Sequence, residues 1–169
     1  MTNKNSRVVG WTIGRMAVML LLYLGITAAA TAQNFGEARA PHSARDFEKR
    51  AFTRYERGDL SGALADYDSA IKLDPQSASA YFSRGSLQHA RGRREEALQD
   101  LGEALRINPN MAAAWYNRAT LYIEEQNYKQ ALIEINQAIQ LDPKLPQAWN
   151  NRAHIYLRQN NPQSALADY

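Results

Sequence analysis

The sequence predicts an all-α fold built from a repeated pair of helices, and three observations support this prediction. The segment SGALADY at 61–67 returns as QSALADY at 163–169, which is 102 residues or three periods of 34 later. Small, aromatic and aliphatic residues recur at fixed places in that period with helical spacing. A proline also recurs near the end of each complete period, where it would end a helix.

The period divides the chain from residue 44 onward into four units. Asp74-Pro75, Asn108-Pro109 and Asp142-Pro143 align one period apart, and the units are 44–77, 78–111, 112–145 and an incomplete 146–169. Position 1 is the first residue of each unit. Because repeated units bury their apolar faces on their neighbours, we expect one stacked array.

Each unit contains two stretches with the spacing of an amphipathic helix. Position 4 is aromatic, and positions 8, 20 and 27 are small, in every unit that reaches them: Phe47, Tyr81, Trp115 and Trp149; Ala51, Gly85, Ala119 and Ala153; Ala63, Ala97, Ala131 and Ala165; Ala70, Ala104 and Ala138. The small residues would let helix backbones approach closely, and the rings would fill the remaining space.

Turn formers and caps mark the expected helix boundaries. Gly58-Asp59, Gly92, Asn127 and Asn160-Asn161-Pro162 separate the two helices of the units. We expect Asn161 to cap a helix whose first residue is Pro162. Ser43 and Asp46 form an approximate capping box where the first helix should begin.

The combination of an aromatic residue at position 4, small residues at 8, 20 and 27, and proline at 32 resembles the tetratricopeptide repeat (TPR) family over residues 44–169. The resemblance implies a right-handed α-solenoid of antiparallel helix pairs, the TPR superhelix. The chain departs from the family at position 7, where arginine replaces the usual leucine in every unit. It also departs at position 11, where Arg54 and Gln88 replace the usual tyrosine in the first two units.

Residues of opposite charge recur at positions 7 and 23. Position 7 holds Arg50, Arg84, Arg118 and Arg152, and position 23 holds Asp66, Asp100, Glu134 and Asp168. The arginines could form a basic ladder for phosphate or an acidic partner. A charge at a normally apolar position needs a partner, so we favour a structural ion-pair ladder that joins the helices of one unit or of neighbouring units.

The resemblance also implies a concave surface lined by the first helix of each unit. The candidate partner-binding residues on it are Phe52, Tyr55, Phe82, Tyr116, Asn117, Ile123, Asn151 and His154. The asparagines could hold the main chain of an extended peptide, and the rings could select side chains. The alternative is that the asparagines are only solvated and the rings cover neighbouring helices.

Family members that bind chaperone tails use lysine at position 5 and asparagine at position 9 of a unit. This chain has neither residue at its respective position: Glu48, Phe82, Tyr116 and Asn150 at 5, and Phe52, Ser86, Thr120 and His154 at 9. The resemblance therefore does not imply that specificity.

The first 32 residues have the three parts of an export signal. Basic residues up to Arg15 precede an apolar run, MAVMLLLYLGI, and a small-residue tail, TAAATA, with an expected cleavage site after Ala32. The alternative is an N-terminal membrane anchor formed by residues 8–32, although membrane spans usually need about 20 predominantly apolar residues. We expect an exported protein, periplasmic or secreted, that contacts a membrane only if the segment is uncleaved.

The charge balance gives no reason to expect a nucleic-acid partner. Residues 1–32 contain three of the 20 basic residues and none of the 17 acidic ones, so the remainder has 17 of each sign. Residues 33–43 have no apolar period, and we predict that they form a flexible spacer.

No motif for catalysis or cofactor binding is recognisable in the sequence. His42, His89 and His154 occupy unrelated places, the chain has no Cys, and no phosphate-binding glycine loop or nucleophile motif is present. We therefore expect no enzyme activity, metal, cofactor or small-molecule substrate.

These observations favour a noncatalytic adaptor or scaffold that binds a protein or peptide in the concave groove. Two alternatives remain open. The second helix of the last unit ends at Tyr169 and is expected to be marginal on its own, so the C-terminal edge could drive self-association into a structural scaffold. The chain could also be a truncated part of a larger TPR protein.

Overall fold

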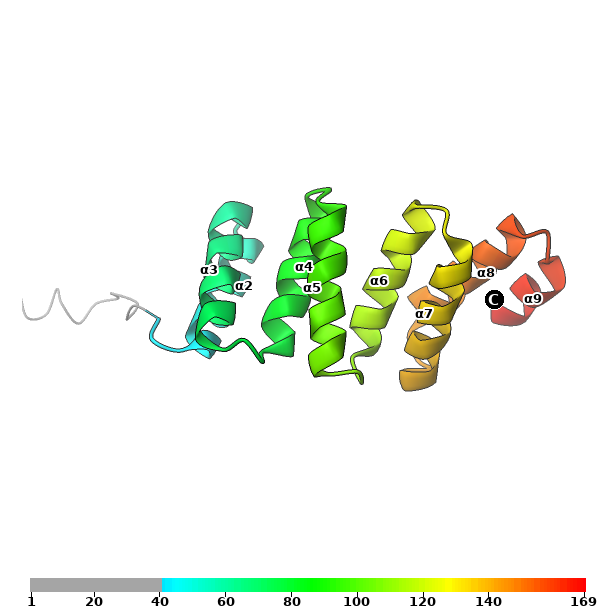
Figure 1. The fold of residues 1–169 in the computed structure, drawn as a ribbon. Coiled ribbons are helices and arrows are strands. Elements are labelled where there is room, and N and C mark those ends of the chain that lie inside the picture. The colour runs from blue at the N-terminus through cyan, green and yellow to red at the C-terminus, as the bar shows by residue number, and fades with distance from the viewer. Residues whose placement is uncertain (1–40) are drawn as a thin grey trace, which may run out of the picture. The chain divides into compact units, whose positions relative to one another are not determined.

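The computed structural model describes residues 41–169, which form one body of eight helices without strands (Figure 1). The helices are α2 (Ala44–Glu56), α3 (Leu60–Leu73), α4 (Ala78–Ala90), α5 (Arg94–Ile107), α6 (Ala112–Glu124), α7 (Tyr128–Leu141), α8 (Pro146–Arg158) and α9 (Pro162–Asp168). The predicted export signal, and residues 33–40 of the predicted spacer, lie outside the described residues.

The helices are arranged as an all-α solenoid, which confirms the predicted fold class. The most extensive contacts join α2 to α3, α4 to α5, α6 to α7 and α8 to α9, so each unit is one helix pair. Smaller contacts join α3 to α4, α5 to α6 and α7 to α8, and the pairs follow one another from α2 to α9 (Figure 1). The first helices also contact each other, α4 with α6 and α6 with α8.

Side chains cap several helix starts. Ser43 accepts a hydrogen bond from the backbone N–H of Asp46, whose carboxylate accepts one from the Ser43 N–H, so the predicted capping box is confirmed. Asn161 caps α9, which begins with Pro162 as predicted.

The turn inside every unit ends the first helix in the same way. The residue at position 15 has a left-handed backbone with φ of 80° at Gly58, 73° at Gly92, 59° at Gln126 and 57° at Asn160. In the third unit, the N–H of Gln126 bonds to Ile123 O and the N–H of Asn127 bonds to Tyr122 O, which is a Schellman motif. Only two of the four units place glycine there, although glycine adopts this conformation most readily.

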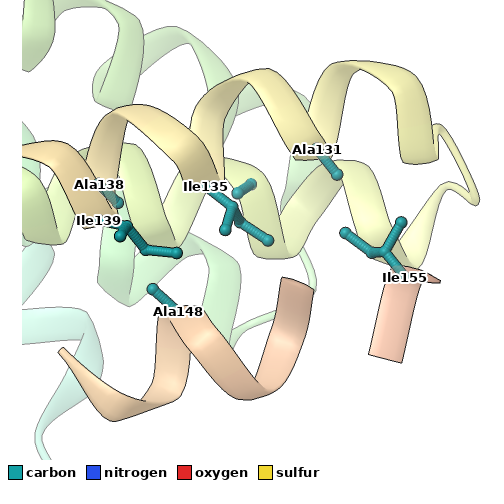
Figure 2. Close-up of a cluster of buried hydrophobic side chains, with 7 residues drawn as sticks. Ala131, Ile135, Ala138, Ile139, Ala148 and Ile155 are labelled. Atoms are coloured by element: carbon teal, nitrogen blue, oxygen red, sulfur yellow. The ribbon is translucent and has the colours of Figure 1, made fainter. Parts of the chain in front are cut away.

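The alanines at positions 8, 20 and 27 form the contacts between helices and are completely buried or nearly so. Figure 2 shows one core cluster, in which Ala131, Ile135 and Ala138 of α7 lie beside Ala148 and Ile155 of α8. Trp115 packs against this cluster and also against the cluster of the preceding unit, so the ring at position 4 connects successive cores.

Candidate functional site

The arginine at position 7 pairs with the acidic residue at position 23 of its own unit. Both carboxylate oxygens accept hydrogen bonds: 2.8 and 2.5 Å for Arg50 and Asp66, 2.7 and 2.6 Å for Arg84 and Asp100, 2.9 and 2.9 Å for Arg118 and Glu134, 2.8 and 2.6 Å for Arg152 and Asp168. The four carboxylate side chains are only 2 to 6% exposed. Each pair therefore joins the two helices of one unit through nearly buried charge.

The same guanidinium groups lie over the aromatic ring three residues earlier. The distance from Cζ to the ring centre is 5.2 Å for Arg50 and Phe47, 5.6 Å for Arg84 and Tyr81, 4.9 Å for Arg118 and Trp115, and 4.7 Å for Arg152 and Trp149. Residues three apart on a helix share a face, so the spacing of positions 4 and 7 could have indicated this cation–π contact. With its plane and two N–H groups engaged, each arginine is committed to the fold.

Two of these arginines also reach the preceding unit. Arg84 Nη1 donates to Asp68 Oδ1 at 2.7 Å, and Arg152 Nη1 donates to Asn136 Oδ1 at 2.8 Å. Hydrogen bonds to Asp100 raise the pKa of the Arg84 guanidinium. Burial lowers this pKa, the hydrogen bond to Asp68 raises it further, and the net pKa lies above the ordinary value. Position 25, which supplies Asp68 and Asn136, is Gly102 in the second unit and offers Arg118 no side chain.

Four of the candidate partner-binding residues line one pocket. Phe52 and Tyr55 of α2, Phe82 of α4 and Asn117 of α6 surround a space of about 330 Å³. Its lining also includes Tyr67 and Leu87, which are buried. Phe52 and Tyr55 are 55% and 49% exposed, which is unusual for large rings and leaves them available to a partner.

Asn117 is oriented by a short chain of hydrogen bonds. Its Nδ2 donates to Ser86 Oγ at 2.9 Å, and Ser86 Oγ donates to the Phe82 carbonyl at 2.8 Å. Within the described residues no group donates to the amide oxygen of Asn117, a residue that lines the pocket, so this acceptor has no hydrogen bond within the fold.

Tyr67 was not among the candidates, because position 24 faces the core. Its ring nevertheless reaches the pocket from α3, and burial raises the pKa of its hydroxyl while Ser83 lowers it. Position 24 is Leu101 and Ile135 in the next two units. The polar hydroxyl of Tyr67 at this core position was therefore the sequence signal that could have identified it as a pocket residue.

A second pocket, of about 430 Å³, adjoins the first and shares Phe52, Tyr67 and Ser83 with it. Its other lining residues lie on α2 and include the exposed side chains of Arg45 and Lys49. Together, the two pockets form what we term the N-terminal groove.

The remaining candidates lie elsewhere. Tyr116 and Ile123 are half-buried and pack against the core cluster of the third unit. Asn151 is half-buried and His154 is exposed on α8, and neither lines the N-terminal groove. The structure thus groups the candidates of the first two units with Asn117 and does not bring the others to them.

Within residues 41–169, no cluster of His, Asp and Glu side chains has an arrangement that could hold a metal ion. The same residues include no helix of the length and hydropathy needed to span a membrane.

Comparison with protein families identifies the class of protein. A model described as TPR repeat matches residues 53–92 and 119–160, and a tetratricopeptide repeat model matches residues 88–138. Together, the two models cover 53–160, and the chain belongs to the tetratricopeptide repeat family. A comparison with curated protein sequences found no match.

Solved structures of TPR proteins share the fold. A crystal structure of MamA is 21% identical with a TM-score of 0.71, covering 76% of this chain and 75% of MamA. The first TPR domain of Spaghetti (RPAP3), bound to the HSP90 peptide SRMEEVD, is 18% identical with a TM-score of 0.67, covering 74% and 99%. The TPR domain of Arabidopsis OM64 is 23% identical with a TM-score of 0.64, covering 66% and 93%.

Proposed function

We propose that this chain is a noncatalytic adaptor that binds a peptide segment of a partner protein in the N-terminal groove. The observation that carries the proposal is the pocket between Phe52, Tyr55 and Phe82, which has two exposed rings at its rim and buried side chains in its lining. Such a pocket suits one large apolar side chain of a ligand. Asn117 lines the same pocket, and its amide oxygen would accept a hydrogen bond from a peptide N–H.

The fold supports this proposal, because the TPR domain of RPAP3 was solved with a bound peptide. The chaperone-tail specificity is not part of the proposal, since Glu48 and Phe52 stand where tail-binding TPR units have lysine and asparagine. Glu48 is moreover engaged within the fold, accepting hydrogen bonds from Ser77 and Ser79 at 2.7 Å each.

Selection from a random peptide library tests this function. Peptides should be enriched on residues 41–169 and lost on the Phe52→Ala, Asn117→Ala double variant. The matched control is Leu73→Ala, Ile133→Ala, which removes two similarly exposed apolar side chains that line neither pocket. Equal enrichment on all three proteins, or none on any, would refute groove binding; circular dichroism checks that each variant is folded.

A second candidate function is self-association through the last unit. Leu157, Leu166 and Tyr169 are 47%, 78% and 71% exposed, so α8 and α9 present apolar surface. Sedimentation velocity between micromolar and millimolar concentration should then show growing assemblies that Leu157→Glu, Leu166→Glu abolishes. A monomer over the whole range would exclude this candidate.

We also propose that residues 1–32 direct export and are removed. The basic start, the apolar run and the A-x-A arrangement ending at Ala32 support this proposal. Mass spectrometry of the full-length chain expressed in a bacterium should find a mature protein that starts at Gln33. An intact N-terminus in the membrane fraction would instead favour the anchor.

A further inference from the structure

The N-terminal groove contains two different chemical environments side by side. Because both pockets include Phe52, Tyr67 and Ser83, they adjoin, and one peptide could contact both. The pocket towards α4 is bounded by Tyr55, Phe82 and Leu87, and it is the more apolar of the two. The pocket on α2 is bounded by Arg45 and Lys49.

The cations of the second pocket have no salt-bridge partner among the described residues. Arg45 and Lys49 are exposed, and neither forms an ion pair with a described residue, whereas Arg50 and Arg54 on the same helix both pair with Asp66.

The acidic residues nearby are committed to other contacts. The Glu48 carboxylate lines the pocket but accepts hydrogen bonds from two hydroxyls, of Ser77 and Ser79. Asp46 accepts backbone N–H groups in the capping box. These hydrogen bonds leave the Glu48 carboxylate charged, so the lining with Arg45, Lys49 and Glu48 has an excess of one positive charge beside the apolar pocket.

We propose that the groove selects a segment in which a large apolar residue lies next to an Asp or Glu side chain. The apolar side chain would enter between Tyr55 and Phe82, and the carboxylate would face Arg45 and Lys49. This inference rests on the proposed peptide binding and adds the chemistry of the partner.

The carboxylate is assigned to a side chain and not to the end of a chain. Tail-binding TPR units hold a chain terminus with lysine at position 5 and asparagine at position 9, whereas the first unit has Glu48 and Phe52 there. A peptide that continues past both pockets would also keep its contact with Asn117.

Sequencing the selected peptides tests the inference separately from the function. With amidated peptides in the library, acidic residues beside an apolar one should be enriched on the unmodified protein. On Arg45→Glu, Lys49→Glu they should be replaced by Lys or Arg, while the apolar preference persists. The control Lys72→Glu, Lys129→Glu changes charge equally at exposed cations that line neither pocket, and it should select the original acidic motif.

Binding of individual peptides gives the magnitude. For a selected acidic peptide, we expect Kd to rise on the order of tenfold in Arg45→Glu, Lys49→Glu and to remain unchanged in the control. Peptides enriched without acidic residues, or acidic peptides insensitive to the charge reversal, would overturn the inference and leave peptide binding intact. Enrichment that depends on a free C-terminal carboxylate would also overturn it, and no enrichment at all would refute peptide binding itself.

Discussion

Arg118 and Glu134 lie on opposite helices of the third unit and are joined by two hydrogen bonds of 2.9 Å each. Glu134 is 2% exposed and also accepts a hydrogen bond from Gln130 at 2.9 Å. The other face of the arginine is covered by the ring of Trp115. Position 7, usually leucine in the family, thus holds a charge that the fold satisfies on several sides.

Removing Arg118 should destabilise the protein strongly, because Glu134 would remain as a buried and largely unpaired charge. We expect Arg118→Leu to lower the free energy of unfolding by about 3 kcal/mol. The double variant Arg118→Leu, Glu134→Leu removes both charges and should recover most of the loss, since apolar residues can replace a buried ion pair at little cost. Urea unfolding of the unmodified protein, both single variants, Arg118→Leu and Glu134→Leu, and the double variant measures the coupling between the two sites.

The solvent-exposed pair of Arg106 and Glu103, with side chains 59% and 45% exposed, is the control for this double-mutant cycle. Its coupling should be below about 1 kcal/mol. A similar coupling for both pairs, or a double variant as unstable as Arg118→Leu alone, would contradict the interpretation of Arg118 and Glu134 as a buried pair.

A side chain at residue 102 should give Arg118 a hydrogen bond to the preceding unit, like those that Arg84 and Arg152 already make. A Cβ added to Gly102 would meet only Arg118 Nη1, at 3.9 Å, so there is room for a substitution. Gly102→Asp would place a carboxylate at the position equivalent to Asp68, which accepts a hydrogen bond from Arg84. Gly102→Ala should stabilise α5 by about 1 kcal/mol through helix propensity alone.

The intrinsic helix propensity of aspartate is about 0.6 kcal/mol worse than that of alanine. We nevertheless expect the Asp variant to be at least as stable as the Ala variant in low salt, because of the new bond to Arg118. Thermal unfolding of both variants, in low and high salt, measures the difference. If Gly102→Asp falls below Gly102→Ala by the propensity difference, the inferred bond does not form.

The sequence was enough to predict the helix pairs, the caps at Ser43 and Asn161 and the buried alanines, because these depend on residues close in sequence. The full environment of Arg118 was harder to predict. Matching charges at positions 7 and 23 indicated a pair but left open whether it lay within a unit, since that depends on how the two helices are rotated.

The site was predicted only in part, because pockets form where rings from different units meet. Phe52 and Phe82 meet Tyr67 in the N-terminal groove, whereas Tyr116 packs onto the core of the third unit. The family pattern assigns Phe52, Phe82 and Tyr116, which are all on first helices, to one surface. Which of them leave a hollow depends on the sizes of side chains contributed by neighbouring helices.

The turn of the third unit should gain stability from glycine. Gln126 has φ of 59° in its Schellman motif, and the equivalent residues of the first two units are Gly58 and Gly92. A left-handed conformation costs a residue with a side chain roughly 1 kcal/mol, so Gln126→Gly should raise the free energy of unfolding by about that amount. Thermal or urea unfolding measures the change.

Asn160 offers an internal control for this prediction. It occupies the same position with φ of 57°, but asparagine tolerates the left-handed region better than glutamine. Asn160→Gly should therefore have the smaller effect, and Gln126→Ala should give no gain. A loss of stability in Gln126→Gly would mean that the glutamine side chain makes a contact that outweighs its backbone strain.

Glu124 should contribute to the acid stability of the contact between the second and third units. His89 Nε2 lies 2.8 Å from Glu124 Oε1, and Arg94 Nη2 donates to Oε2 at 3.2 Å. Burial raises the pKa of Glu124, but the hydrogen bonds from His89 and Arg94 outweigh it, and the net pKa lies below the ordinary value of 4.5. Unfolding therefore takes up a proton near this pH.

The stabilisation from Glu124 is complete above the unfolded-state pKa and is lost as the pH falls through the lower folded-state pKa. Between about pH 5 and pH 3, the melting temperature should thus decline less steeply in Glu124→Gln than in the unmodified protein. The effect at neutral pH should be below about 1 kcal/mol, since both side chains are partly exposed. Glu95→Gln, at an exposed residue of α5 without an ion pair among the described residues, should retain the original slope. Parallel curves for the unmodified protein and Glu124→Gln would show that this carboxylate does not titrate with folding.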